Sequence, residues 1–412
     1  MKTGRPLLWV AGLSLLLVVA TGVVAWLVVV DDDPYVAPPP SASRGAGPSP
    51  ALAAQALSDL EAAVRSGDEA AARALAPPDD PAAADRLAGV VANARAARVR
   101  DFSLRYVDAQ GAYDDGAWHA AADATWRFAG FDPAPATAEV LVGLQDVDDR
   151  VAVTGIGGGD RVSPLWLSGP LRVHRTADTL VLVDGSADEA RRYDLHAARA
   201  VPVVRRVLPQ WRRGLVVEVP ASVDALDRVL DAEPGRYDQI AAVTTSADGQ
   251  LTPRAPVHVF VNPDVFDGLR PTGAQVVMSH EATHVATGAF TSPAPLWLLE
   301  GFADYVALRD VPLPLRRSAA QAVAEVRRDG LPRTLPSASD FDSRTTELGA
   351  TYESAWLAAR LLAQDGGEAA LVRLYRDVDR GRPFAAALRS DLGLSVAAFT
   401  RQWRGLLQDL AG

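Results

Sequence analysis

The residues best suited to chemistry stand in one short run, His280-Glu281-Ala282-Thr283-His284. Positions four apart lie on the same face of a helix, so the imidazoles of His280 and His284 can reach one metal ion. Glu281 lies beside them and is placed to activate a water molecule at the metal. Apolar residues flank the run, which indicates a buried helix whose polar groups need a partner. The run predicts a metal site; the alternative is a polar helix that faces solvent.

A second helix is predicted to supply the third metal ligand. Fifteen residues separate His284 from Glu300, and Pro293 and Pro295 end the connection between the two helices. The pattern over residues 296–310 then predicts a helix on which Glu300 can face both histidines. Glu300 would complete a set of two histidines and one glutamate, leaving a fourth position for water. The alternative is an ordinary exposed helix carboxylate.

Two further observations narrow the type of site. Asp304 lies one turn after Glu300 on the same face, so its carboxylate could accept the outer N–H of a ligand histidine and fix the tautomer. The alternative for Asp304 is again an exposed carboxylate. Thr287 and Phe290 stand where the metzincin pattern would place a glycine and a histidine. The metzincin class is therefore excluded.

The composition limits the remaining chemistry. The chain has 412 residues, of which 49% are hydrophobic and 22% charged, enough for two folded domains. It contains no cysteine, which excludes disulfides, thiol catalysis and cysteine-based metal sites. Any metal must therefore be bound by histidines and carboxylates. The formal net charge is −10 and no basic stripe is present, so we expect no nucleic-acid partner.

The amino-terminal segment is predicted to anchor the chain in a membrane. The run from Leu7 to Val30 is apolar, uncharged and long enough to cross a bilayer. Lys2 and Arg5 precede it and three aspartates follow it. By the positive-inside rule, residues 1–30 are then a cytoplasmic amino terminus and a single-pass anchor in the cell membrane, and the rest lies outside the cytoplasm. A cleaved signal peptide is the alternative.

Residues 31–50 are predicted to be a linker and residues 51–185 a first α+β domain. The linker is rich in proline, serine, glycine and alanine. Helical patterns at 51–76 and 82–99 come first in the domain, followed by runs typical of strands. These strand-like runs are 99–107, 118–128, 138–144, 150–156 and two within 165–183. Helices followed by an antiparallel meander resemble the cone-shaped fold of nuclear-transport-factor-2-like or cystatin-like domains.

Residues 186–412 are predicted to form a second domain that contains the metal site. Ser186 and Glu189 match a capping box at the start of a helix that continues to about residue 208. Three strands precede the metal-site helix, which is predicted near 273–290, and only helices follow it. The strands are predicted at 214–219, 239–245 and 255–261. This order predicts a small mixed sheet joined to an all-helical carboxyl-terminal half, so the whole chain is α+β.

The two segments of the metal site, His280-Glu-x-x-His284 and Trp297-Leu-Leu-Glu-Gly-Phe-Ala-Asp-Tyr305, resemble the gluzincin metallopeptidases. The likeness is greatest to the compact peptidase-MA-like domains of bacterial proteins. It is specific over residues 273–310 and extends loosely over 187–412. The resemblance implies a Zn²⁺ site with the following roles: zinc ligands His280, His284 and Glu300, general base Glu281, and Asp304 behind a ligand histidine.

The resemblance also implies how a peptide would bind. The strand at 255–261 would border the cleft and pair with an extended substrate, while His258 within it would be structural. Tyr352, from the helical half, would bind the developing oxyanion, with a packing role as the alternative. The gap before Glu300 is shorter than in thermolysin-like and aminopeptidase families. The Gly-x-Met-Glu-Asn motif that grips a substrate amino terminus is missing, which favours an endopeptidase over an aminopeptidase.

Together these patterns predict a membrane-anchored, extracytoplasmic zinc metallopeptidase that acts on a peptide or protein substrate. The alternative is an exported binding or scaffold protein with a catalytically silent peptidase-like domain, in which residues 51–185 would carry the function. The presence of Glu281 favours the enzyme, because a purely structural metal site has no use for that residue.

Overall fold

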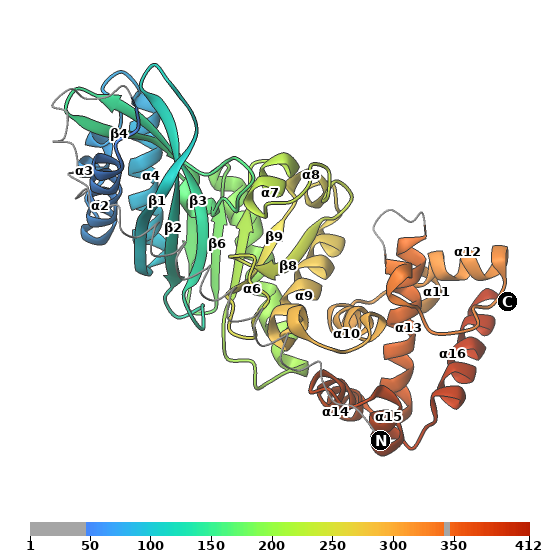
Figure 1. Cartoon of the computed structure of the whole chain (residues 1–412). Coiled ribbons are helices and arrows are strands. Elements are labelled where there is room, and N and C mark those ends of the chain that lie inside the picture. The colour runs from blue at the N-terminus through green and yellow to red at the C-terminus, as the bar shows by residue number, and fades with distance from the viewer. Residues whose placement is uncertain (1–46, 342–346) are drawn as a thin grey trace, which may run out of the picture. The chain divides into compact units, whose positions relative to one another are not determined.

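A computed structural model describes residues 47–341 and 347–412, and residues 48–412 form one compact unit (Figure 1). The predicted membrane anchor, Leu7 to Val30, and most of the predicted linker lie outside the described residues. Among the helices that are described, none combines the length and apolarity that a membrane crossing requires. The unit mixes helices with two sheets, as the α+β prediction requires.

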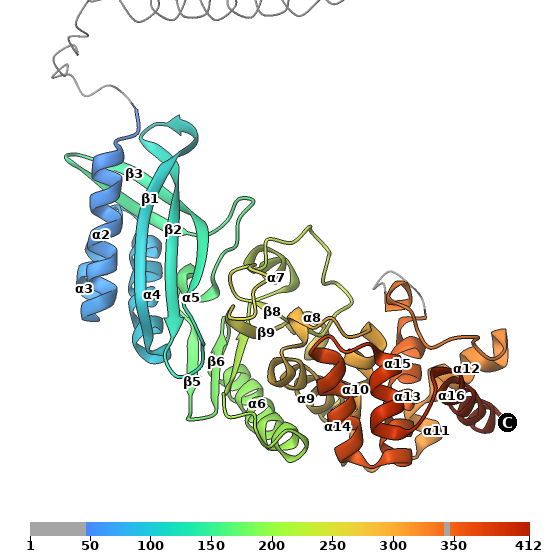
Figure 2. The same ribbon diagram turned by 60° about the horizontal axis from the view of Figure 1, so that its bottom comes forward.

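The amino-terminal part of this unit packs helices on a four-stranded antiparallel sheet (Figure 2). The helices are α2 (Pro50–Ser66), α3 (Glu69–Ala74) and α4 (Pro81–Ala97). The strands, in spatial as well as chain order, are β1 (Val99–Asp114), β2 (Ala117–Phe128), β3 (Ala136–Val147) and β4 (Arg150–Ile156). Alternate residues of β2, from Trp118 to Phe128, are buried in one core with the helices, as the period of a strand dictates. The predicted helices and the first four strands of the predicted antiparallel meander are confirmed; the two runs within 165–183 belong to the second sheet.

The second sheet has five strands in the order β5-β6-β7-β9-β8. Its strands are β5 (Arg172–Arg175), β6 (Thr179–Val183), β7 (Leu215–Val219), β8 (Ala242–Ser246) and β9 (Val257–Val261), and a short helix, α5 (Leu165–Ser168), precedes them. The pairs β6–β7 and β7–β9 are parallel, whereas β5 and β8 are antiparallel edge strands, so the sheet is mixed as predicted.

Two features of this sheet differ from the sequence-based expectations. Strands β5 and β6, which the sequence groups with residues 51–185, pair with the second sheet, so the predicted boundary at residue 185 separates β6 from its neighbour β7. The strand predicted to pair with a substrate, 255–261, contains β9, which lies between β7 and β8. Its backbone hydrogen bonds are already used on both sides, so that prediction is wrong. The edge strand next to β9 is β8.

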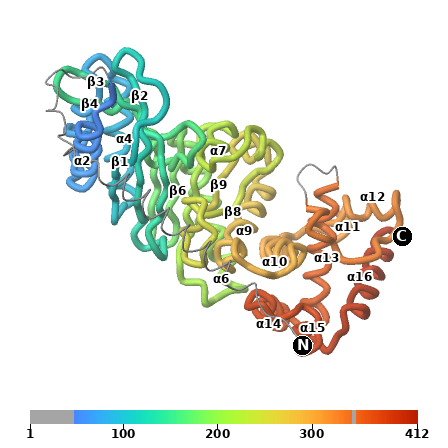
Figure 3. The backbone as a smooth tube through the Cα atoms, viewed as in Figure 1, coloured from blue at the N-terminus to red at the C-terminus, as the bar shows by residue number. Residues whose placement is uncertain are grey.

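Helices α6 and α9 cover one face of the second sheet, and further helices form the carboxyl-terminal half (Figure 3). In chain order, the helical elements after β6 are α6 (Ala187–Val207), α7 (Val223–Val229), α8 (Pro263–Phe266), α9 (Pro271–Thr287), the 3₁₀ turn η1 (Ala289–Thr291), α10 (Leu296–Leu308), α11 (Leu315–Ser318), α12 (Ala320–Asp329), the 3₁₀ turn η2 (Ala338–Phe341), α13 (Leu348–Gly366), α14 (Glu368–Asp379), α15 (Phe384–Leu392) and α16 (Val396–Ala411). The predicted capping box opens α6: Glu189 N–H donates to Ser186 Oγ, and Ser186 N–H donates to the Glu189 carboxylate.

Each face of the second sheet is buried in a different core. Leu180 and Phe260 belong to the core of the first sheet and its helices. Val181 and Val259, one residue along, belong to the core under α6 and α9. Because successive side chains in a strand point to opposite faces, these apolar runs bury both faces of the sheet. The sheet thereby joins the amino-terminal part to the helices that carry the metal-site motif.

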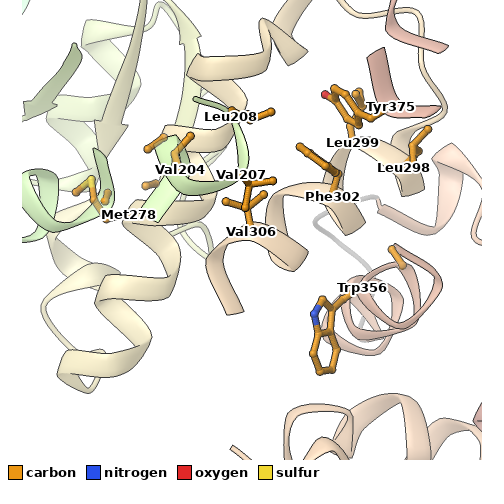
Figure 4. Packing of buried hydrophobic residues seen from close by; sticks show 14 of the residues in the cluster. Val204, Val207, Leu208, Met278, Leu298, Leu299, Phe302, Val306, Trp356 and Tyr375 are labelled. Carbon is orange, nitrogen blue, oxygen red and sulfur yellow. The ribbon is translucent and has the colours of Figure 1, made fainter. Parts of the chain in front are cut away.

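The second core continues from α9 into the helical half (Figure 4). Met278 of α9, Phe302 of α10 and Trp356 of α13 are all buried in it. The ring of Phe302 stacks on that of Tyr375 from α14, with centroids 4.3 Å apart. Burying a side chain of this size contributes roughly 1.5–3 kcal/mol of stability. This packing sets how α9, α10 and α13 lie against one another.

A buried charged cluster links the two parts of the unit. His258 on β9 is fully buried; its Nδ1 lies 2.6 Å from Glu218 Oε1 on β7, and its Nε2 lies 3.0 Å from Asp132 Oδ1, beyond the end of β2. The other oxygen of Asp132 accepts the Phe128 N–H at 2.6 Å. Burial by itself lowers the pKa of His258, but Asp132 and Glu218 outweigh it and raise the pKa to about 10. His258 is thus an imidazolium clamped by two carboxylates, a structural role.

Because of this buried charged cluster, the stability of the folded protein is expected to fall as the pH becomes alkaline. The pKa of His258 is about 10 in the folded protein, against an ordinary value of 6.5. The folded state therefore binds more protons between these values, and the free energy of unfolding falls as the pH rises through the window. The expected slope is up to about 1.4 kcal/mol per pH unit. Urea unfolding of the full-length chain from about pH 6.5 to pH 9.5 measures it.

The matched variant is Glu218→Gln, which removes one charge and preserves the shape and an acceptor oxygen. The free energy of unfolding of this variant should fall less steeply over the same pH window. The imidazolium of His258 then has one neighbouring carboxylate and not two, so its pKa is raised less. Equal slopes in the two proteins would show that His258 is not the group that titrates.

Candidate metal centre

Helix α9 presents the two histidines from a buried turn. It begins with Pro271 at the first helical position and ends at Gly288, whose φ of 68° closes the helix. His280 and His284 are each 9% exposed. The helix packs on β8 and β9 on one side and contacts α10 on another. The predicted helix is therefore present, and its polar turn lies inside the protein as the apolar flanks indicate.

Three donor atoms from two helices converge on one point. Nε2 of His280 lies 2.9 Å from Nε2 of His284 and 3.1 Å from Oε2 of Glu300. Nε2 of His284 lies 3.4 Å from the same oxygen of Glu300. Within residues 47–341 and 347–412, this is the one group of histidines and carboxylates that could hold a metal ion. The structure thus brings together the three residues predicted as ligands.

Asp304 fixes the orientation of one of these rings. Its Oδ1 lies 2.8 Å from Nδ1 of His280, which donates its proton there and leaves Nε2 with a lone pair in the neutral ring. In the structure Nε2 faces a carboxylate oxygen and the second imidazole nitrogen, so a positive charge at the centre of the cluster, either a proton or a metal ion, is favourable. The edges of a tetrahedron with bonds of about 2.1 Å are about 3.4 Å long, near the observed separations. The donor set fits a zinc ion.

The charges in the cluster support one another. Burial alone lowers the pKa of His280, but Asp304 and Glu300 outweigh it and raise the pKa well above its usual value. Burial alone raises the pKa of Glu300, but His284 and His280 outweigh it and hold the pKa below its usual range. Glu300 is therefore ionised at neutral pH, the state in which a carboxylate binds a metal.

Glu281 lies in a cleft beside the donor atoms. The cleft has a volume of about 250 Å³. It is lined by Ala241, Ala242, Val276, Val277, His280, Glu281, Asp304 and Tyr352. Burial raises the pKa of Glu281, against the opposing effect of the two histidines. A carboxylate with a raised pKa is a stronger base than an exposed one, which suits proton transfer near neutral pH.

Tyr352 reaches the cleft from α13, as predicted. The centroid of its ring lies 6.2 Å from that of His280 and 5.3 Å from that of Phe341, which meets it edge-on. Burial, followed by the negative charge of Glu300, raises the pKa of Tyr352 above its ordinary value. The phenol therefore keeps its proton and can donate a hydrogen bond.

A larger hollow lies away from this chemistry. It has a volume of about 780 Å³ and is formed by α2 with β1, β2 and β3. Two of the charged residues that line it, Arg105 and Asp123, form an ion pair with each other. It is lined by none of the three candidate metal ligands, His280, His284 and Glu300.

Two residues that shape the site were not predicted from the sequence. Thr244 on β8 donates a hydrogen bond to the carboxylate of Glu281. Gly301, next to Glu300, lies so close to α13 that a Cβ there would overlap the carbonyl oxygen of Ala355. A helix with glycine in its interior is the signal for such a close approach. The strand pattern shows that Thr244 and Thr245 face opposite ways, but not which of them meets α9.

Comparison with models of known protein families found no match to this chain, and comparison with curated proteins found none either. What the site can do has therefore to be inferred from its own residues and their geometry.

The contact between α10 and α13 at Gly301 gives a test of how the site is held. In a helix interior, alanine is normally more stable than glycine by about 1 kcal/mol. We expect Gly301→Ala to destabilise the protein nonetheless, by about 1–3 kcal/mol, because the new methyl group forces two backbones apart. Thermal or urea unfolding measures the change. The control is Gly405→Ala in α16, where a Cβ meets nothing within 4 Å and stability should rise. A stabilised Gly301→Ala protein would contradict the close contact.

Proposed function

We propose that this protein is a zinc metallopeptidase that hydrolyses peptide bonds outside the cytoplasm, held at the membrane by the segment from Leu7 to Val30. The observation that carries the proposal is the convergence of His280, His284 and Glu300 at a cleft that also contains the carboxylate of Glu281. The membrane anchor and the location are supported by the sequence alone.

Each residue of the cleft has a defined task in this reaction. Zinc bound by His280, His284 and Glu300 would supply a Lewis acid for the scissile carbonyl and lower the pKa of a water molecule. The tasks of the chain itself fall to residues beside these ligands. Glu281 accepts the proton of the attacking water and delivers it to the leaving amine, for which its raised pKa is suited. Tyr352 donates a hydrogen bond to the developing oxyanion.

The edge strand β8 provides a place for an extended peptide. Among the described strands it pairs with β9 alone, so its other edge has no neighbouring strand. Ala242 at its start, and Ala241 before it, line the cleft. A peptide added to this edge would be held by main-chain hydrogen bonds that do not depend on its terminus. This arrangement supports an endopeptidase.

The alternative of a binding protein with a silent peptidase-like domain is favoured by one observation, the hollow of about 780 Å³ on the amino-terminal part. The two functions differ in what they require of Glu281. Only the enzyme needs a carboxylate that is next to the metal but is not one of its ligands.

Glu281→Gln is the deciding variant. It should bind one zinc ion per chain, because Glu281 is not a ligand, and lose about 10²–10⁴-fold in turnover, because an amide cannot accept the proton. Zinc analysis and hydrolysis of a peptide library by the full-length chain measure the two quantities, and a chelator should abolish wild-type hydrolysis. Glu69→Gln, at an exposed ion pair with Arg95, is the matched control and should behave as wild type. Wild-type protein that binds no zinc would favour the binding protein; an active Glu281→Gln variant would remove Glu281 from the mechanism.

A further inference from the structure

Thr244 makes the only hydrogen bond that the carboxylate of Glu281 has among the described residues. Its Oγ1 lies 2.6 Å from Oε2 of Glu281 and 3.2 Å from the backbone oxygen of the same residue. The shorter contact has the length of a hydrogen bond between a hydroxyl and an ionised carboxylate. Among residues 47–341 and 347–412 the other oxygen, Oε1, has no hydrogen-bond partner, and Glu281 lines the cleft.

The sheet holds this hydroxyl in place. Threonine is branched at Cβ, so its χ1 angle is restricted in a strand. Thr244 pairs with Val259 of the interior strand β9, and β8 packs against α9. Glu281, by contrast, has a long side chain on a helix. The hydrogen bond therefore ties a flexible carboxylate to a second, independently fixed element of the fold.

The hydrogen bond from Thr244 matters because a cation in the metal site would attract the carboxylate of Glu281. His280, His284 and Glu300 offer three donor atoms that could hold a cation between them. A neighbouring carboxylate is attracted to that cation and, if free to turn, would compete for the position that a water molecule must take. A hydroxyl bonded to one of its oxygens opposes the turn.

We propose that Thr244 is a positioning residue for the general base: its hydroxyl holds Oε2 of Glu281 away from the metal and leaves Oε1 facing the cleft. This inference rests on the proposed function of Glu281. It adds a requirement that the metal-site motif does not contain, namely a hydroxyl on the edge strand at the position that faces α9.

Replacement of the hydroxyl by a methyl group tests the proposal. Thr244→Val keeps the shape and the strand preference of the residue, and it should lower kcat by about 10–100-fold, the effect of a displacement of about 1 Å. KM should stay within about twofold, and one zinc ion per chain should still bind. Thr244→Ser, which restores the hydroxyl, should recover most of kcat.

Thr245→Val is the matched control. It makes the same change one residue along, where the side chain points to the opposite face beside His258, and it should leave kcat and KM unchanged. Equal rates for Thr244→Val and Thr245→Val would overturn the proposal. A rise in KM with unchanged kcat would also overturn it, because that result describes a substrate contact and not the positioning of a base.

A crystal structure of Thr244→Val supplies a readout that does not depend on turnover. The carboxylate of Glu281 should leave its wild-type position, while the serine variant should keep it. An unmoved carboxylate in the valine variant would contradict the positioning role, whether or not the wild-type chain hydrolyses peptides. If valine prevents folding, Thr244→Ala carries the same measurements. Failure of the peptidase proposal would instead be seen in the wild-type chain, as an absence of zinc or of hydrolysis.

Discussion

The close approach of two imidazole nitrogens and a carboxylate oxygen, from His280, His284 and Glu300, places three donor atoms where one cation could be held. The fold is arranged so that these atoms meet. Spacing along α9 supplies the two histidines, but the third donor depends on how α10 crosses α9. That crossing is fixed by the shared apolar core and by Gly301, which lets α13 approach α10 closely. The candidate metal site is therefore a product of helix packing as much as of sequence spacing.

The second sheet connects this site to the amino-terminal part. One of its faces shares a core with α2, α4 and the first sheet, and the other face lies under α6 and α9. Its two last strands in spatial order, β9 and β8, carry polar residues toward opposite faces. His258 joins the carboxylates that link the sheet to the amino-terminal part, while Thr244 meets the carboxylate of Glu281. The second sheet thus joins the amino-terminal part to the helices of the candidate site, and it also carries the residue that contacts the proposed base.

Much of this arrangement can be predicted from sequence periodicity, because helix spacing brings His280 and His284 together and apolar runs mark the strands. The capping box at Ser186 also follows from a local pattern, as does the placement of Glu300 and Asp304 on one face of a helix. The pairing of strands cannot be predicted in this way, because a short apolar run does not indicate which other strand it will pair with. For this reason the sequence-based assignments of β6 to the first sheet and of β9 as the strand beside the substrate are wrong. The roles of Thr244 and Gly301 likewise depend on which elements meet across the core.

The measurement that tests the central claim most directly is the location of bound metal by anomalous diffraction at the zinc edge, on crystals of the protein grown with equimolar zinc. The account predicts one strong peak, with Nε2 of His280, Nε2 of His284 and a carboxylate oxygen of Glu300 each about 2.0–2.2 Å away, and with Glu281 outside the set of ligands. A peak at other residues, coordination by Glu281, or no ordered zinc at these three side chains would contradict it.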